Sequence, residues 1–114
     1  MSDSQKRKHF RLEFPPAERP KLKVGKYELV VLDVSEGGCS AEVDQSVATA
    51  FAHVGIRVAG VFVFADGEKI DVAGEVLRVI SPGRLAIVFS KGPSFAKMMA
   101  EDRRIRSKYA RSSS

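Results

Sequence analysis

The sequence predicts an all-β core: a small six-stranded antiparallel β-barrel with a C-terminal amphipathic α-helix and a flexible basic N-terminal arm. Three observations predict this fold. Short runs rich in β-branched residues follow one another from residue 21 to residue 90, turn signals separate these runs, and two runs contain an internal glycine. Gly60 and Gly74 are those glycines, and glycine within a strand is typical of a sheet that bends sharply or closes on itself.

The predicted elements follow one another along a single domain of 114 residues. Residues 1–20 form the arm, because they are polar and basic and then contain several prolines. Residues 21–90 form the barrel, with strands expected at KLKV, KYELVVLDV, GCSAEV, GIRVAGVFVFA, KIDVAGEVLRVI and RLAIVF. The turn DGE predicts a hairpin between the fourth and fifth of these strands.

Residues 93–111 form the predicted helix, because the spacing of apolar residues changes there to steps of three and four. The helix is expected to pack on the barrel through Phe95, Met98, Met99, Ile105 and Tyr109. Its other face is interpreted as solvated and carries Arg103, Arg104, Arg106 and Lys108.

Composition narrows the class of protein. The formal net charge of +5 favours an anionic partner, and nucleic acid, nucleotide and membrane surface all remain open on charge alone. The longest apolar run, VAGVFVFA, is far shorter than the roughly 20 residues of a membrane span, so no membrane insertion is expected. The N-terminus lacks the apolar segment of a signal peptide, which predicts a cytoplasmic location.

The cysteine and histidine content argues against an enzyme. Cys39 is the single cysteine, which excludes an internal disulfide and a multi-thiolate metal site, and we expect it to be a small buried residue. His9 and His53 have no partner at catalytic or metal-binding spacing. Because no nucleophile–base pair or metal cluster can be assembled from these residues, neither catalysis nor a bound cofactor is predicted.

Two motifs carry chemistry. The stretch KRKHFR contains Arg7 and Arg11, and DVSEGG contains Asp33, Ser35 and Gly38 at a predicted strand-to-strand turn. An arginine fork binds phosphate oxygens in a bidentate way, and a carboxylate accepts hydrogen bonds from N–H donors. A serine hydroxyl can donate to a ligand acceptor, and glycine allows a tight turn and close approach of the backbone to the ligand. The alternatives are a solvated tail for the arginines and a turn cap for Asp33 and Ser35.

The pattern Arg7-x-x-x-Arg11 followed by Asp33-x-Ser35-x-x-Gly38 resembles the two-part motif of the PilZ domain family, bacterial receptors for the second messenger cyclic di-GMP. The order of elements over about residues 5–100 is similar as well. The resemblance implies that these motif residues bind cyclic di-GMP. The family often carries a base-stacking side chain after a G-x-V pattern, and Arg78 follows GEV here, although a surface role is the equal alternative.

The resemblance also implies a function: binding of cyclic di-GMP, relayed in trans to an unidentified downstream protein. The arm is expected to be extended without ligand, because like charges repel, and to be pinned across the barrel when ligand binds. One alternative is a small basic barrel that binds nucleic acid, which is disfavoured because the strands lack exposed aromatic residues at stacking spacing. The other is a PilZ-like adaptor that does not bind nucleotide, which is disfavoured because the full motif is present.

Overall fold

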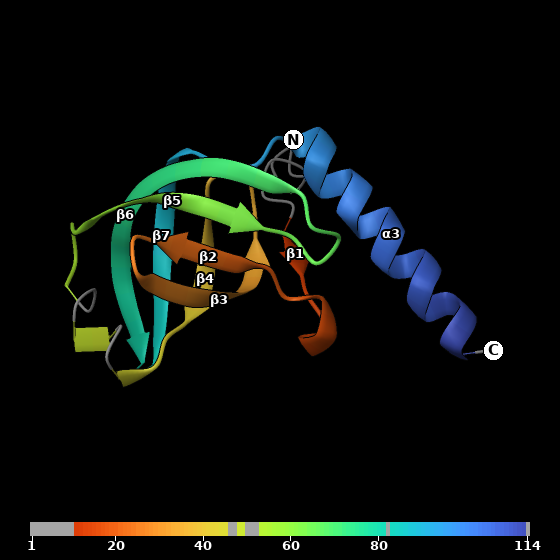
Figure 1. Cartoon of the computed structure of the whole chain (residues 1–114), viewed down its shortest axis with the longest axis horizontal. Coiled ribbons are helices and arrows are strands. Elements are labelled where there is room, and N and C mark those ends of the chain that lie inside the picture. Colours follow the sequence, from red (N-terminus) through yellow and green to blue (C-terminus); the bar gives the residue numbers. More distant parts are fainter. Residues whose placement is uncertain (1–10, 46–47, 50–52, 82, 114) are drawn as a thin grey trace, which may run out of the picture.

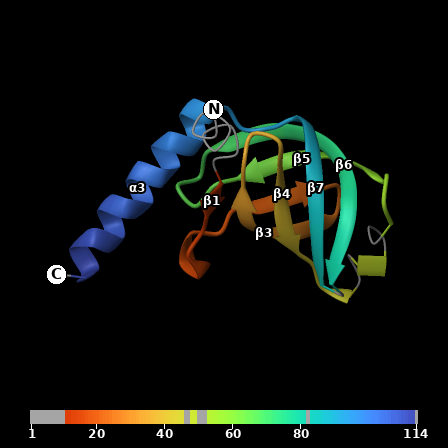
Figure 2. The ribbon, with the colours of Figure 1, turned by 180° about the vertical axis from the view of Figure 1, so that it is seen from behind.

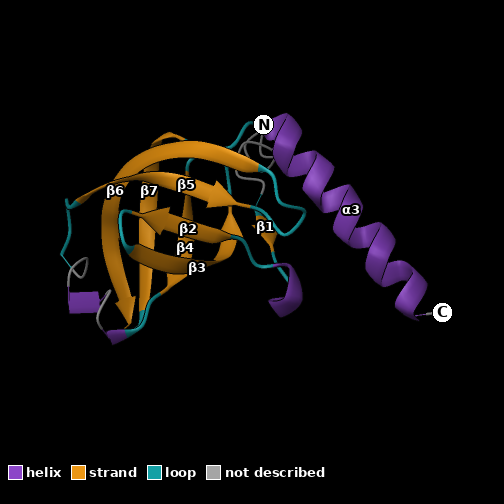
Figure 3. Cartoon of the chain, viewed as in Figure 1, coloured by secondary structure: helices purple, strands orange, loops and turns teal. Residues whose placement is uncertain are grey.

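The structure is a computed structural model that describes residues 11–45, 48–49, 53–81 and 83–113. Within these residues, six strands close into an antiparallel barrel in the order β3-β2-β5-β6-β7-β4, because β4 pairs with both β7 and β3 (Figures 1 and 3). The strands are Lys21–Val24 (β2), Tyr27–Val34 (β3), Gly38–Glu42 (β4), Arg57–Val63 (β5), Lys69–Ser81 (β6) and Arg84–Lys91 (β7). The predicted six-stranded barrel is confirmed.

Alternating side chains of these strands fill the barrel interior. Phe62 lies within this core, with its ring centroid 5.6 Å from that of Phe64 and 5.9 Å from that of Phe89 in edge-on contacts. Leu22, Leu29 and Phe62 are fully buried, and each such side chain stabilises the fold by about 1.5–3 kcal/mol. Because the interior is packed with apolar groups, polar functional residues must lie on the outside of the barrel.

The two strand glycines lie where neighbouring backbones approach closely. A Cβ atom on Gly60 would lie 2.1 Å from the carbonyl oxygen of Lys23, and one on Gly74 would lie 2.1 Å from that of Val88. The register of β6 against β7 also shifts between Ala73 and Gly74. Both glycines therefore serve the closure and bending of the sheet, as the sequence predicted.

The described part of the predicted arm packs against the barrel. Leu12–Glu13 (β1) pairs with the end of β3, and Pro16–Glu18 (η1) forms a 3₁₀ turn. Leu12 and Phe14 are buried, so strand pairing and two apolar contacts offset the entropy cost of holding this segment. The prediction of a flexible arm is therefore wrong for residues 11–20. Residues 1–10, including Arg7 and His9, lie outside the described residues.

The C-terminal helix Phe95–Ser113 (α3) lies beside one end of the barrel and extends past it (Figures 1 and 2). Met98 and Ile105 are buried, as predicted, whereas Phe95 is 44% exposed and Tyr109 is 36% exposed. Glu101 lies between the two buried residues on the packing face and is itself only 1% exposed. Among the described residues, no helix combines the length and the apolar character needed to cross a bilayer.

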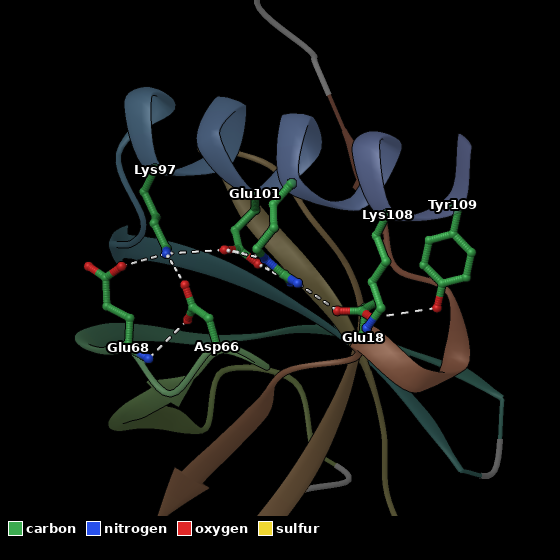
Figure 4. Close-up of polar contacts among 8 residues, drawn as sticks. Glu18, Asp66, Glu68, Lys97, Glu101, Lys108 and Tyr109 are labelled. Carbon is green, nitrogen blue, oxygen red and sulfur yellow. Dashed lines mark hydrogen bonds and ion pairs between the residues drawn. The ribbon is translucent and has the colours of Figure 1, made fainter. Parts of the chain in front are cut away.

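A network of ion pairs around the buried carboxylates of Glu18 and Glu101 attaches α3 to the rest of the domain (Figure 4). The Arg104 guanidinium lies 3.0 Å from Glu18 Oε1 and 2.9 Å from Glu101 Oε1, so one cation bridges two buried carboxylates. Lys108 Nζ lies 2.7 Å from Glu18 Oε2. We call this network the helix clamp, and its members are Glu18, Asp66, Glu68, Lys97, Glu101, Arg104 and Lys108.

The helix clamp corrects the interpretation of the basic helix face in part: Arg103, Arg106 and Lys108 are exposed, as predicted, whereas Arg104 is half-buried. Arg104 bridges buried Glu18 and Glu101 from a side chain that is 30% exposed, and Lys108 also pairs with Glu18 although its own side chain is 57% exposed. Arg106 is exposed and pairs with Asp102 one turn away, 2.9 Å between Nε and Oδ2. Much of the positive charge of α3 is therefore neutralised within the molecule, which weakens the case for a nucleic-acid-binding helix.

Candidate functional site

A cavity of about 320 Å³ lies on the outer face of the barrel. The strands that form this face, β4, β7 and β6, run side by side (Figure 2). Five of the six predicted site residues line it, namely Arg11, Asp33, Ser35, Gly38 and Arg78. They come from the arm, from the end of β3, from the following turn, from the start of β4 and from β6. The sixth, Arg7, lies outside the described residues. The fold therefore brings together residues that the sequence places in three separate stretches.

A β-bulge in β3 determines where Asp33 lies. Val31 pairs with Ala41 and Asp33 pairs with Ser40, so Leu32 is an extra residue in the register of β3 against β4. Val31 and Leu32 are both buried, and Asp33 is turned to the outer face, as expected of a bulge that redirects a side chain. The bulge places the Asp33 carboxylate beside the Ser40 hydroxyl.

The Asp33 carboxylate has a different partner at each oxygen. Arg11 Nη1 donates to Oδ1, and Ser40 Oγ donates to Oδ2 at 2.8 Å. The Arg11 side chain is 50% exposed and the Asp33 side chain is 20% exposed. Because an exposed ion pair contributes only about 0–1 kcal/mol, Arg11 can leave Asp33 for a stronger anionic partner at little cost.

Ser35 and Gly38 have structural roles in the turn as well as places in the cavity wall. The Ser35 hydroxyl donates to the Gly38 carbonyl oxygen at 3.3 Å, so the turn-cap alternative describes its present contact. A Cβ atom on Gly38 would lie 2.2 Å from the Ile87 carbonyl oxygen of β7. Gly38 is therefore required for the close approach of β4 to β7, and the tight turn proposed from the sequence is not the reason for it.

Cys39 lies under the cavity and is 4% exposed, which confirms the prediction of a buried cysteine. Burial raises the pKa of the Cys39 thiol to about 12, and the nearby Asp33 charge adds to this effect. The thiol is therefore protonated at neutral pH and is a poor nucleophile. This supports its interpretation as a packing residue.

Residues of β6 and β7 that the sequence analysis did not single out complete the cavity. Leu77 and Ile80 are extra residues at two register shifts of β6 against β7, and they are 55% and 44% exposed. They line the cavity together with Arg78 and with Arg84 at the start of β7. Cations, a carboxylate and apolar side chains thus converge, which suits a ligand that has phosphates, N–H donors and flat apolar rings.

A second concavity of about 410 Å³ adjoins the first and shares Val88 with it. Its lining residues include Ala59, Ala73 and Val88, together with the charged residues Arg57 and Glu75. It contains a single arginine, whereas three arginines line the first cavity. The first cavity is therefore the better candidate for binding an anion.

No group of histidine, cysteine, aspartate and glutamate side chains that could hold a metal ion occurs among the described residues, and His53 is exposed.

In comparisons with known proteins, the family model described as PilZ domain matches residues 5–105. No curated protein and no solved structure matches the chain. The matched range includes both motifs, the whole barrel and the first half of α3.

Proposed function

Because the chain belongs to the PilZ domain family, we propose that it is a bacterial receptor that binds cyclic di-GMP and is read by a partner protein. PilZ is a family of binding and adaptor domains and is not a known enzyme family. The observation that carries the proposal is that Arg11, Asp33, Ser35, Gly38 and Arg78 line one cavity. The side chains of Arg11, Asp33, Ser35 and Arg78 match the ligand chemically, since cyclic di-GMP has two phosphates and two guanine edges.

The contacts of the free protein suggest how binding would proceed. A phosphate offers Arg11 a bidentate, charge-assisted partner, which is stronger than its exposed pair with Asp33. When Arg11 moves to the phosphate, Asp33 Oδ1 becomes available to the N–H donors of a guanine edge. Arg78 would stack its guanidinium on a base, and the cavity walls Leu77 and Ile80 would contact the apolar ring faces. Ligand binding would thus exchange one ion pair for several contacts.

Isothermal titration calorimetry with cyclic di-GMP, cyclic di-AMP and GMP tests the proposal. We expect micromolar or tighter binding of cyclic di-GMP, which corresponds to about −8 kcal/mol, within reach of several charge-assisted contacts. Cyclic di-AMP should bind much more weakly, because adenine does not present the donor pattern that Asp33 accepts. GMP should also bind weakly, because it has one base and one phosphate. If cyclic di-GMP shows no detectable binding, the alternative of a PilZ-like adaptor that does not bind nucleotide would be favoured.

A further inference from the structure

We propose that Ser40 is a positioning residue that aims the Asp33 carboxylate at the ligand, an inference that rests on the proposed binding of cyclic di-GMP. Ser40 is not part of either sequence motif. It lies directly opposite Asp33 in the register of β3 and β4, and its Oγ donates to Asp33 Oδ2 at 2.8 Å. Ser40 is also in the wall of the cavity, although only 8% exposed.

The division of partners between the two carboxylate oxygens supports this role. Arg11 holds Oδ1 from an exposed side chain, whereas Ser40 holds Oδ2 from a buried position on a strand. Serine has a short side chain whose position is set by the backbone of β4, so its hydrogen bond depends on few rotatable bonds. If a ligand phosphate takes Arg11 away, the hydrogen bond from Ser40 still holds the carboxylate in the same orientation.

Orientation matters because the guanine edge presents two N–H donors side by side, on N1 and on the exocyclic N2. A carboxylate has about four lone-pair sites, so Oδ2 can accept from Ser40 and from the ligand at the same time. Without the Ser40 hydroxyl, Asp33 would rotate more freely, and binding would have to restrict that rotation. Ser40 would therefore influence the choice of base as well as the affinity.

Substitution by threonine and by valine tests the hydroxyl with side-chain shape held constant. Ser40→Thr and Ser40→Val add the same branched bulk on a β-strand, and only threonine keeps the donor. By calorimetry we expect Ser40→Thr to bind cyclic di-GMP within about threefold of the wild type. Ser40→Val should bind about tenfold more weakly than Ser40→Thr, the effect of losing a modest hydrogen bond to a charged group. Ser40→Ala provides the same comparison with the wild type without added bulk.

A double-mutant cycle distinguishes positioning from a purely structural effect. If Ser40 acts through Asp33, the same Ser40→Ala change should have little effect on binding in an Asp33→Ala background. If Ser40 only supports the strand, its loss should cost the same factor in both backgrounds. A cyclic dinucleotide with hypoxanthine bases, which lack the exocyclic N2 donor, provides a second test. The preference for guanine over hypoxanthine should fall in Ser40→Ala, whereas a general loss of fold would weaken both ligands equally.

The outcomes separate this inference from the proposed function. If the wild type does not bind cyclic di-GMP, the proposed function fails and the inference fails with it. If the wild type binds while Ser40→Ala binds equally well, or if the cycle is additive, the receptor assignment stands and the role of Ser40 is wrong. Coupling between Ser40 and Asp33 together with a reduced preference for guanine would establish the positioning role.

Discussion

Two of the clusters in which carboxylates meet arginine among the described residues differ in exposure, the helix clamp and the cavity. In the helix clamp, Glu18 and Glu101 are each 1% exposed and share Arg104. At the cavity, Asp33 meets Arg11 through side chains that are 20% and 50% exposed. Buried charges are costly to separate, whereas an exposed pair is worth little and exchanges readily. The same pairing therefore holds a helix in one place and leaves a site open for a ligand in the other.

The short segment from Arg11 to Glu18 connects the two clusters. Arg11 pairs with Asp33 at the cavity, Leu12 and Phe14 are buried against the barrel, and Glu18 lies under α3. One end of the segment is thus held by an exchangeable contact and the other by buried ion pairs. Substitutions in the two clusters should separate into those that change stability and those that change binding.

The largest expected effect is on stability, from Arg104→Ala. Removing this guanidinium leaves Glu18 with Lys108 and Glu101 with Lys97, and it leaves the two buried carboxylates without their shared cation. Breaking a buried ion pair typically costs about 3–5 kcal/mol, and we expect the lower end because Arg104 is 30% exposed. Urea denaturation followed by circular dichroism would measure the change in the free energy of unfolding.

Arg106→Ala is the matched control on the same helix. Arg106 also pairs with a carboxylate of α3, but its side chain is 76% exposed. Since arginine and alanine both favour helix, we expect a loss of less than about 0.5 kcal/mol. Equal losses in the two variants would show that burial does not determine how much an arginine pair of α3 stabilises the fold.

The next effect is on binding, from Arg11→Ala. We expect affinity for cyclic di-GMP to fall at least tenfold, or by about 1.4 kcal/mol, because the variant lacks the proposed phosphate contact. The free energy of unfolding should change by less than about 1 kcal/mol, because the pair with Asp33 is exposed. Arg11→Lys keeps the charge but loses the planar fork, so its affinity should lie between those of the wild type and Arg11→Ala.

Two results for Arg11→Ala would contradict the expected separation of ligand binding at the cavity from stability at the helix clamp. If Arg11→Ala binds cyclic di-GMP as tightly as the wild type, Arg11 does not contact the ligand. If it unfolds as readily as Arg104→Ala, the contact with Asp33 is part of the framework of the fold. Calorimetry and urea denaturation on the same preparations would distinguish these outcomes.

The barrel was predictable because its signals are local. Alternating β-branched residues and turn residues mark each strand, and Gly60 and Gly74 mark the places where strands approach closely. The motif residues Arg11, Asp33, Ser35 and Gly38 were also predictable, since their spacing is the signal. Their convergence at one cavity follows once β1 and β4 both pair with β3.

The buried charges and the rest of the cavity wall were not predictable in the same way. Glu18 is buried only because α3 covers it, a contact between distant parts of the chain that leaves no local pattern. Glu101 did have a signal, since it falls between Met98 and Ile105 on the apolar face of the helix. Leu77 and Ile80 reach the cavity through β-bulges in β6, which shift the alternation of side chains by one residue, and Ser40 meets Asp33 because the bulge in β3 turns that carboxylate outward.

The smallest expected effect is on the pH dependence of stability, and it comes from Glu18 in the helix clamp. Hydrogen bonds from Lys108 and Arg104 outweigh burial and lower the pKa of Glu18 below its ordinary value of 4.5. A carboxyl whose pKa is lowered by folding stabilises the protein fully above its unfolded pKa and loses that contribution as pH falls through its folded pKa. The stability difference between the wild type and Glu18→Gln, which cannot ionise, should therefore be constant near neutral pH and shrink below about pH 4.5.

Urea denaturation of both proteins between pH 3 and pH 7 would measure this difference, with equal m values as the control that both unfold as compact two-state domains. The effect should be smaller than that of Arg104→Ala, because only one carboxyl loses its charge while Glu101 keeps its bonds to Arg104 and Lys97. A stability difference that stays constant down to pH 3 would show that Glu18 is not held as a carboxylate. The clamp would then depend on Glu101 alone, and η1 would be attached to α3 through neutral contacts.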